Sequence, residues 1–546
     1  MTDKLIIALA QLNPIVGGVA ANLAKAKAEV GKLSGVDLVL FPELFMAGYP
    51  PEDLVLRPSF VKACKAAVEE LALEFASGPA ILMGLPWLES GRDGDKLHNS
   101  VALLNGGKIE TVRHKFDLPN YGVFDEKRVF QPGPAPGPIS FKGVRIGVPI
   151  CEDIWTEETC ETLAETGAEI LLSPNGSPFE RNKDDVRLNL VVARVTETGL
   201  PLAYLNQVGG QDELVFDGAS FVLNADRSLA LQMPMFEEAV AITEWKRGPH
   251  GWSMSAGEVS KLPENEEETW KACVLGLRDY VDKNKFPGVV LGMSGGIDSA
   301  VVAAMAVDAL GASRVHCVML PYDYTSEDSL VDAKECTKLL GARYDVIPIK
   351  EPVEGFLSAL GPMFEGTTSG VTEENLQSRS RGVVLMAISN KFGAMVLTTG
   401  NKSEMSVGYA TLYGDMNGGF NPIKDVYKME VYRLAAWRNT QSHVIPTRII
   451  TKAPTAELRP NQTDQDSLPP YAVLDDILEG LVEREQTLAE IALRGHDPVL
   501  IKRIQHMLYV AEYKRRQAAP GVKITRRNFG RDRRYPITNG FRDQIG

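Results

Sequence analysis

The chain has 546 residues, and its 58 Lys and Arg against 71 Asp and Glu give a formal net charge of −13 with neutral histidine. At roughly 100 to 250 residues per domain, this length predicts two substantial domains and excludes a peptide hormone or a small binding module. Hydrophobic types make up 44% and charged types 24%, as in globular proteins rather than disordered chains. No apolar run approaches the roughly 20 residues that span a bilayer, so no membrane partner is expected.

The N-terminus, the cysteines and the charge indicate the compartment and the class of partner. The first ten residues lead into an apolar run without a basic segment or a small-residue cleavage site, which predicts a cytoplasmic protein without a secretory signal. A net negative chain repels phosphate backbones, so a nucleic-acid partner is not expected. The cysteines lack CxxC spacing, which argues against a disulfide framework or a structural zinc site and favours buried thiols: Cys64, Cys151, Cys160, Cys273, Cys317 and Cys336.

Short apolar runs alternate with helical stretches over about the first 250 residues. Residues 22–33 and 60–75 show the clearest helical pattern, and the apolar runs include LIIALAQL, VDLVLFPEL, AILMGLPWL, VRIGVPICED, AEILLSPN and LPLAYLNQ. Strands separated by amphipathic helices are typical of a layered α/β domain. The first half is therefore predicted to be a sheet-and-helix domain.

Three residues with complementary chemistry each follow a predicted strand in this half. Glu43 stands in FPEL, Lys115 in RHK and Cys151 in PICEDIW. A thiolate is a strong nucleophile, a carboxylate can take its proton, and an ammonium stabilises both the thiolate and an oxyanion. Together the three suffice for amide hydrolysis, while a surface carboxylate, a solvated lysine and a buried apolar cysteine remain open alternatives. His114 is expected to point to the opposite face of the strand from its neighbour Lys115.

The order and spacing of these three residues resemble the carbon–nitrogen hydrolase (nitrilase) superfamily. The segment LPNYGVFDEKRVFQPG at 118–133 resembles the glutaminase branch that is fused to NAD synthetase. This resemblance implies an αββα sandwich in which the carboxylate is the base, the lysine holds the oxyanion and the cysteine is the nucleophile. It also implies that three further residues line a glutamine pocket: Tyr121, Ser177 and Arg181. Glu126 matches an additional carboxylate beside the triad, and a surface salt bridge among Asp125, Glu126 and Lys127 is equally compatible with the sequence.

The composition changes near residue 260. The polar, acidic stretch SAGEVSKLPENEEE predicts a linker and the start of a helix. We therefore place a first domain at 1–255, a linker at 256–268 and a second domain at 269–546. A helix at about 267–283 precedes FPGVVLGMSGGIDSAVVAAMAVDALG and then RVHCVMLPY, which indicates a parallel βαβ unit. Open parallel sheets bind ligands beyond the carboxyl ends of their strands, where the glycine turn of this unit lies.

That glycine turn has the residues of an anion site. Its glycines can bring backbone N–H groups against phosphate oxygens at a helix N-terminus, Asp298 can hold Mg²⁺, and the two serine hydroxyls can bind pyrophosphate. No Gly-Lys-Ser/Thr ending follows, so the turn is not a Walker A loop. A glycine turn with Asp and Ser as helix caps is the open alternative. The residues concerned are Ser294, Gly295, Gly296, Asp298 and Ser299.

The turn resembles the loop of ATP pyrophosphatases, which split ATP into AMP and pyrophosphate to activate a carboxyl or carbonyl group. ENLQSRSR at 374–381, TTGNKSEMSVGYATLYGD at 398–415 and NPIKDVYKMEVYRLA at 421–435 resemble the ammonia-adding domain of NAD synthetase. The resemblance implies a doubly wound parallel sheet, Rossmann-like and of the adenine nucleotide alpha hydrolase type. It also implies that Glu404 is a second Mg²⁺ ligand, that Lys428 contacts the phosphates and that Thr399 lies near the nucleotide. Three further residues are implied to lie near the dinucleotide: Asn375, Arg379 and Asp415. Thr398 departs from the family, which more often has glycine there.

The C-terminal stretch APGVKITRRNFGRDRRYPITNGF is similar to the end of glutamine-dependent NAD synthetases, so the resemblance covers nearly the entire chain. It implies a homo-oligomeric enzyme that uses glutamine, ATP and nicotinate adenine dinucleotide, with Mg²⁺ as cofactor. Glutamine would be hydrolysed through a cysteine thioester in the first domain. The nicotinate carboxylate would be adenylated in the second, where ammonia displaces AMP to give NAD⁺. Ammonium is not a nucleophile, so a sheltered passage for ammonia is expected.

Two other functions remain open from the sequence. An amidotransferase of the same loop class could act on a different nucleotide or a tRNA base, although ENLQSRSR and the YGD segment argue against this. A noncatalytic nucleotide-binding or RNA-binding protein could use the basic segment 514–542, which has ten basic residues and one acidic residue with aromatic residues interleaved. The same segment also fits a solvated arm that pairs with an acidic surface.

Overall fold

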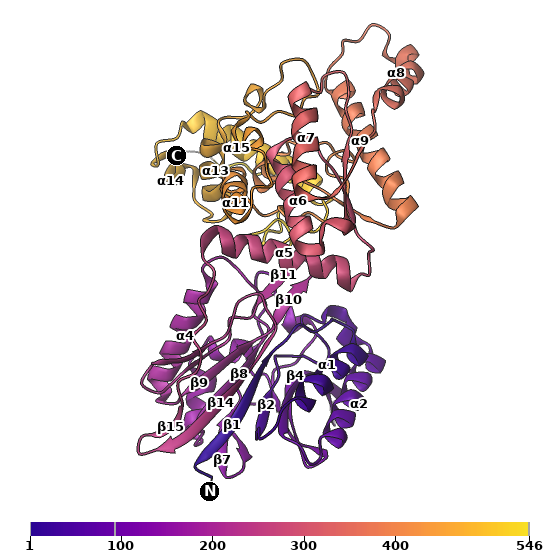
Figure 1. Ribbon diagram of the computed structural model, residues 1–546. Coiled ribbons are helices and arrows are strands. Elements are labelled where there is room, and N and C mark those ends of the chain that lie inside the picture. The colour runs from indigo at the N-terminus through magenta and orange to yellow at the C-terminus, as the bar shows by residue number, and fades with distance from the viewer. Residues whose placement is uncertain (1, 92–93, 544–546) are drawn as a thin grey trace. The chain divides into compact units, whose positions relative to one another are not determined.

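The computed structural model describes residues 2–91 and 94–543 (Figure 1). The chain divides into two compact units, Met1–Pro263 and Glu264–Gly546. Among the described residues, no helix is long and apolar enough to cross a membrane.

Two sheets form the centre of the first unit. The first sheet has the order β15 (Gly251–Met254), β14 (Ala239–Gly248), β1 (Lys4–Gln11), β2 (Leu38–Leu40), β3 (Ala80–Gly91), β4 (Gly94–Asn105), β5 (Lys108–His114). The second has the order β13 (Leu229–Gln232), β12 (Phe221–Leu223), β9 (Leu202–Asn206), β8 (Ile170–Asn175), β7 (Val144–Gly147), β6 (Ile139–Phe141). A separate hairpin joins β10 (Val208–Gln211) to β11 (Leu214–Asp217).

Helices cover the outer face of each sheet, as Figure 1 shows for α1, α2 and α4. The covering helices are α1 (Val19–Gly31) and α2 (Pro58–Glu74) on the first sheet, and α3 (Glu158–Glu165) and α4 (Lys183–Thr198) on the second. The inner faces pack against each other through residues such as Leu40 and Leu172. Strands buried on both faces are nearly continuously apolar, which explains the runs in the sequence. The αββα sandwich is confirmed, and the two predicted helices correspond to α1 and α2.

The second unit is built on a four-stranded parallel sheet. Its order is β18 (Arg343–Val346), β17 (Val315–Met319), β16 (Val289–Gly292), β19 (Met395–Leu397). Val290, Val318 and Val396 pack with helices α8 and α9 on one face, while Leu291 and Cys317 are also buried. The helices of this half are α5 (Asn265–Lys283), α6 (Ile297–Leu310), α7 (Glu327–Leu340), α8 (Lys350–Phe364) and α9 (Val371–Phe392). A doubly wound parallel-sheet fold is confirmed.

Further helices complete the second unit, and several of them share an apolar cluster that includes Leu474, Ile491 and Ile504. They are α10 (Lys402–Val407), α11 (Lys428–Gln441), α12 (Thr447–Thr451), α13 (Tyr471–Val482), α14 (Leu488–Ala492), α15 (Pro498–Val510) and α16 (Glu512–Arg515). Helix α10 matters most for the site, because it follows the end of β19 after a short loop and carries Glu404.

The basic segment 514–542 is not a solvated arm throughout. Arg515, Lys523 and Arg533 are buried. Arg515 pairs with Glu512 at 2.7 Å, and Lys523 pairs with Asp532 at 2.9 Å. These charges are therefore neutralised inside the unit, so the buried part of the segment is not available as a grip for nucleic acid.

Candidate active sites in the two units

The three predicted hydrolytic residues converge at strand ends of the first unit. Glu43 follows β2, Lys115 follows β5, and Cys151 opens a 3-10 turn after β7. All three side chains are buried. Lys115 Nζ donates to Glu43 Oε1 at 2.7 Å, and the charges of both residues act on the Cys151 thiol. The structure therefore brings a carboxylate, an ammonium and a thiol into one buried site.

A second carboxylate shares the ammonium. Lys115 Nζ lies 2.9 Å from Glu126 Oε1, which also accepts the Tyr49 hydroxyl at 2.7 Å. Burial lowers the pKa of Lys115, but Glu126 and Glu43 raise it and prevail, so the lysine stays charged. Asn99 Nδ2 donates to Glu43 Oε1 at 2.7 Å. Because Glu126 is only 5% exposed, the alternative of a surface salt bridge is wrong.

Gly176, after β8, lets the backbone approach the base. Its N–H donates to Glu43 Oε2 at 2.8 Å. A Cβ at this position would lie 2.7 Å from Tyr49 Cδ1 and 3.1 Å from Glu43 Oε2, closer than the aromatic ring allows. Sequence reasoning did not single out Gly176, Asn99 or Tyr49, because no local pattern marks them.

Cys151 lies in a strained turn. Its φ of 49° is in the left-handed region, which non-glycine residues seldom adopt and which often marks functional positions. Burial raises the pKa of its thiol well above the usual range, Glu43 raises it further, and Lys115 lowers it. The sulfur is therefore a neutral thiol at neutral pH, so a nucleophilic role would require a neighbouring group to take its proton.

Asp153 connects the turn of the nucleophile to the segment that carries the ammonium. Its Oδ2 accepts the N–H of Ile150 at 2.9 Å, and its Oδ1 accepts the N–H groups of Phe116 and Asp117 at 3.0 and 2.8 Å. Burial raises its pKa to about 7, although these hydrogen bonds lower it. Because Phe116 directly follows Lys115, Asp153 fixes the two parts of the site relative to each other.

The residues expected at the glutamine pocket occupy different environments. Tyr121 is 53% exposed, and its hydroxyl donates to Glu152, the residue after the nucleophile, at 3.0 Å. Ser177 is buried, and its Oγ accepts a hydrogen bond from Arg187 Nε at 3.1 Å. Arg181 is partly exposed in the loop before α4. Tyr121 thus lies at the surface next to the turn that begins with Cys151, whereas the buried Ser177 is hydrogen-bonded to Arg187.

The second unit has a cavity at the point where its strand order reverses. In chain order the sheet extends from β16 through β17 to β18, and β19 then returns to the other side of β16. Ligands of such sheets bind in the crevice between the two diverging loops. A cavity of about 280 Å³ lies there, and its lining includes residues 292–299, which follow β16, and residues 397–399, which follow β19.

The SGGIDS loop is held in the shape that an anion site needs. Gly295 has a φ of 80°, and a Cβ there would lie 2.5 Å from the carbonyl oxygen of Ser329. The hydroxyls of Ser294 and Ser299 are 3.1 Å apart, and the Gly296 N–H donates to Ser294 Oγ at 3.2 Å. Helix α6 begins at the next residue, so its positive N-terminus faces this loop.

The predicted metal and phosphate residues meet at this cavity. Lys428 Nζ donates to Asp298 Oδ2 and to Glu404 Oε1, the latter at 3.2 Å. Asn401 Nδ2 donates to Asp298 Oδ1 at 2.9 Å. Burial raises the pKa of Glu404 to about 7, Lys428 opposes this shift, and Asp298 and Asp464 add to it. Two carboxylates thus contact Lys428, and a third, Asp464, acts electrostatically on Glu404.

The remaining predicted residues of this unit are not equally close to the cavity. Thr399 and Asp415 line it. Asn375 and Arg379 are not among the described residues that line it. Asn375 Oδ1 accepts the hydroxyl of Thr411 at 2.8 Å, and Arg379 is exposed on α9.

Two cationic residues that sequence reasoning gave no role also line the cavity. Burial lowers the pKa of Arg381, on α9, to about 10, which leaves it charged at neutral pH. Lys452 Nζ donates to Ser329 Oγ at 2.6 Å and to Glu457 Oε1 at 3.0 Å. Arg381 stands inside the ENLQSRSR motif, so its positive charge in that motif could have indicated a site residue. Lys452 lies outside every motif.

Comparisons with known proteins assign both halves. Residues 6–248 match the family described as carbon-nitrogen hydrolase, and residues 269–518 match the family described as NAD synthase. The glutamine-dependent NAD(+) synthetase of Rhodobacter capsulatus is 51% identical over the whole of both chains. That of Xanthomonas campestris pv. campestris (strain 8004) is 47% identical and covers 98% of each chain.

Solved structures agree with these relatives. The glutamine-dependent NAD+ synthetase from Acinetobacter baumannii, in complex with ADP, is 42% identical with a TM-score of 0.79 and covers 99% of this chain and 100% of its own. The enzyme of the same name from Cytophaga hutchinsonii is 22% identical, so its TM-score of 0.83 over 98% of each chain supports the fold alone. With full-length identity of 51% and a charged buried site in each unit, the chain belongs to the glutamine-dependent NAD(+) synthetase family.

Proposed function

We propose that this enzyme amidates nicotinate adenine dinucleotide to NAD⁺ with nitrogen taken from glutamine, using Cys151 in the first unit and the SGGIDS loop in the second. The observation that carries the proposal is the buried Lys115 ammonium between Glu43 and Glu126 at the Cys151 turn. A buried charge of this kind is costly unless it has a function or full pairing. Here it is positioned to act on the thiol and on an oxyanion.

In the first unit, Glu43 takes the thiol proton as the sulfur of Cys151 attacks the side-chain amide carbon of glutamine. Lys115 stabilises the negative oxygen of the tetrahedral intermediate. The carbon–nitrogen bond then breaks, the nitrogen takes a proton and leaves as ammonia, and a thioester remains on the sulfur. Water adds to the thioester, which releases glutamate and restores the thiol. The residues that we propose for glutamine binding are Tyr121, Ser177 and Arg181.

In the second unit, the nicotinate carboxylate attacks the α-phosphorus of ATP, and pyrophosphate leaves. Ammonia then attacks the adenylated carbonyl carbon, AMP leaves, and the amide of NAD⁺ is formed. The loop N–H groups, the Ser294 and Ser299 hydroxyls and the Lys428 ammonium can hold the phosphates. We assign ATP binding to Ser294, Gly295, Gly296, Asp298, Ser299, Thr399 and Lys428, and dinucleotide binding to Asn375, Arg379 and Asp415.

Mg²⁺ fits the donors at this cavity, and we propose Asp298 and Glu404 as its ligands. Both are carboxylates, which Mg²⁺ prefers, and both contact the same Lys428 ammonium, so their oxygens converge. Burial that raises the pKa of Glu404 to about 7 shows that this carboxylate lacks full compensation by protein cations. When bound, the ion would neutralise charge on the phosphates.

The proposal extends to the domains, the assembly and the compartment. We assign the hydrolase to 1–255, a linker to 256–268 and the synthetase with its basic C-terminal segment to 269–546. The division at Pro263 supports a boundary within the linker. Six free thiols support a reducing compartment, for which we propose the cytoplasm. The family resemblance supports a homo-oligomer, which sedimentation velocity would test.

A product assay tests the reaction as a whole. Purified enzyme with glutamine, ATP and nicotinate adenine dinucleotide should form NAD⁺, AMP and glutamate in equal amounts. Omission of the dinucleotide should stop AMP formation. Glutamate release without NAD⁺ under the full conditions would contradict this acceptor and favour an amidotransferase for a different one.

A further inference from the structure

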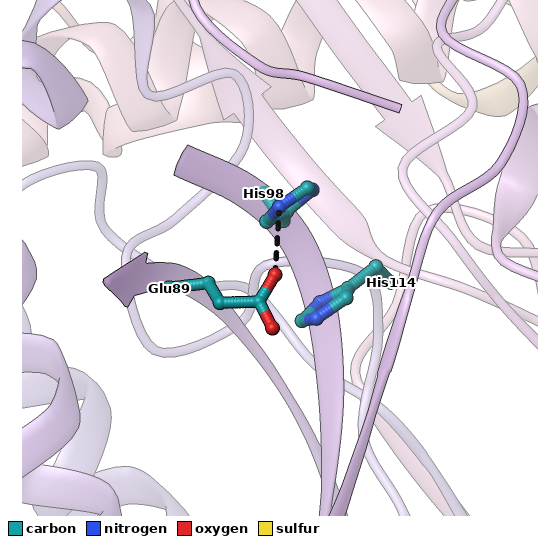
Figure 2. A group of neighbouring side chains, drawn as sticks. All are labelled: Glu89, His98 and His114. Atoms are coloured by element: carbon teal, nitrogen blue, oxygen red, sulfur yellow. Dashed lines mark ion pairs between the residues drawn. The ribbon is translucent and has the colours of Figure 1, made fainter. Parts of the chain in front are cut away.

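Three metal-ligating side chains lie together on one face of the first sheet, outside both proposed active sites. Glu89 comes from β3, His98 from β4 and His114 from β5. Figure 2 shows them pointing toward one another. Because side chains alternate along a strand, their neighbours Asn99 and Lys115 face the other side, where they contact Glu43.

The strand register explains why the three side chains meet. Glu89 pairs with Lys96, two residues from His98 on β4. Ser100, two residues beyond His98 on the same strand, pairs with His114. Residues that are directly opposite or two apart share one face of a sheet and lie within reach of each other.

Each histidine has one ring nitrogen anchored by the protein. His98 Nδ1 lies 2.8 Å from the carbonyl oxygen of Gln131, so this nitrogen carries the proton and donates. Nε2 of His98 is then a bare acceptor, and it is buried without a hydrogen-bond partner among the described residues. His114 Nδ1 lies 2.7 Å from Ser100 Oγ. Anchoring one nitrogen by a carbonyl or hydroxyl is the usual way in which proteins orient a histidine toward a metal.

Glu89 lies beside Nε2 of His98 and forms an ion pair with it only when the ring is protonated, as the dashed line in Figure 2 marks. His98 Nε2 lies 3.6 Å from Glu89 Oε2, which is too long for a hydrogen bond. A buried acceptor left without a donor destabilises the fold. The same 3.6 Å is close to the separation of about 3.3 Å between two ligands of a tetrahedral Zn²⁺ at bond lengths near 2.0 Å.

The third ligand can reach the same point. One ligand atom from each side chain lies within 4.8 Å of the others. The two imidazole rings are stacked 4.3 Å apart, so a shared ion requires the half-buried His114 ring to turn about its Nδ1 contact with Ser100 and the exposed Glu89 side chain to rotate.

We infer that Glu89, His98 and His114 form a binding site for a divalent transition-metal ion, for which Zn²⁺ is the best match. The two imidazole nitrogens are borderline ligands that favour Zn²⁺ over Mg²⁺, and with one carboxylate oxygen they make a ligand set that zinc sites use. Glu89 is 59% exposed, so the fourth position opens to solvent. The site is separate from the Mg²⁺ ligands proposed in the second unit and takes no part in the reaction steps above.

Co²⁺ titration of the full chain, with Mg²⁺ in excess to occupy oxygen sites, tests this inference. A visible absorption band of tetrahedral Co²⁺ should rise to one ion per chain, and Zn²⁺ should displace it. Glu89→Gln, which alters an exposed side chain, should weaken Co²⁺ binding at least about tenfold, and His114→Ala should abolish the band. Ser100→Ala should weaken binding by a similar factor, because it frees the His114 ring.

His250→Ala is the matched control, since it removes an exposed histidine of the same unit. It should bind Co²⁺ as the unaltered chain does. Each variant should retain glutamine-driven NAD⁺ synthesis in the presence of a chelator selective for transition metals, which shows that it is folded. Absence of the band in the unaltered chain, or equal bands in all variants, would overturn the inference.

Discussion

Cys151 lies where its thiol is protonated at rest and can be activated only by a neighbour. Its burial raises the pKa, Glu43 adds to this effect, and Lys115 opposes it without prevailing. A neutral thiol next to a buried carboxylate suits a base that acts during substrate attack. The left-handed backbone holds the sulfur at the start of the turn.

This environment predicts the pH dependence of alkylation. Because the pKa of the Cys151 thiol is raised, its thiolate fraction grows with pH through the neutral and alkaline range. This fraction is still rising at pH 9.0, the usual pKa of a cysteine thiol. Iodoacetamide labelling of this residue, followed by peptide mass spectrometry, should accelerate up to and beyond that pH. Peptide mapping separates this signal from the other buried thiols. A plateau reached already at neutral pH would contradict the raised pKa.

Asp153→Asn should loosen the hydrolytic site without touching the synthetase. The amide loses one acceptor oxygen, so at least one of the three N–H groups that Asp153 binds is left unpaired. We expect the free energy of unfolding to fall by about 1.5–3 kcal/mol. The kcat with glutamine should fall about 10- to 100-fold because nucleophile and ammonium shift relative to each other. Steady-state kinetics with glutamine and with ammonia measure the two routes.

Asp212→Asn is the control for this substitution. Asp212 is exposed in the β10–β11 turn with a φ of 53°, where asparagine is equally favourable. It should behave as the unaltered enzyme does. An equal loss of both routes in Asp153→Asn would mean general damage and would sink the positioning role.

Among single residues, those in a short motif at a strand end could be predicted from the sequence, and those that act through distant contacts could not. The three proposed hydrolytic residues each stand in a short motif at a predicted strand end, so their chemistry and their place are both visible. Tyr49 and Asn99 have no such context. Tyr49 reaches Glu126 across 77 residues of sequence, a contact that only the packing of the strands creates. The Nε2 atom of His98, which has no hydrogen-bond partner in the described part of the chain, likewise becomes apparent only in three dimensions.

The loop between β16 and α6 depends on a glycine at one position. Gly295 combines a φ of 80° with a backbone carbonyl that would lie 2.5 Å from any Cβ. The obstacle is the main chain at Ser329, which cannot rotate away as a flexible side chain could. A larger residue must therefore move the loop or the start of α7, where Ser329 lies.

Gly295→Ala should disable ATP use. The expected result is a loss of at least about 100-fold in kcat/KM for ATP with either nitrogen source, because the phosphate donors shift by the scale of a bond length. Glutamine hydrolysis measured alone should persist. Initial rates at varied ATP give the effect.

Gly311→Ala is the matched control at the other end of α6. Its φ is 82°, but a Cβ there would meet nothing within 4 Å. It should cost about 1 kcal/mol of stability from backbone strain and leave kcat/KM unchanged. If the two variants lost activity equally, the contact at Ser329 would not be the cause.

Elements defined by local pattern could be predicted, and elements stabilised by long-range pairing could not. Strand, glycine turn and apolar helix follow one another directly, so the phosphate loop is visible in the sequence. The C-terminal segment instead depends on distant partners. Asp425 accepts the N–H groups of Ile524 and Thr525, about a hundred residues later, and Lys402 contacts Thr525 Oγ1 at 2.7 Å. Basic composition alone therefore suggested a solvated arm where part of the segment is core.

The molecule as a whole carries two chemistries on two separate cores. In the proposed mechanism, amide hydrolysis uses the thiol and the ammonium of the first unit, and amide synthesis uses the phosphate loop and the carboxylates of the second. Ammonia is the product of one reaction and the substrate of the other. An external supply of ammonia should therefore replace the first unit's reaction. The second unit should then form NAD⁺ without glutamine hydrolysis.

The most direct test is NAD⁺ formation by Cys151→Ala, measured once with glutamine and once with ammonium chloride at alkaline pH. With glutamine the rate should fall to background. With ammonia it should stay within about twofold of the unaltered enzyme, because no step of the second unit uses the thiol. Retained synthesis with glutamine, or loss of the ammonia-driven reaction as well, would contradict the account.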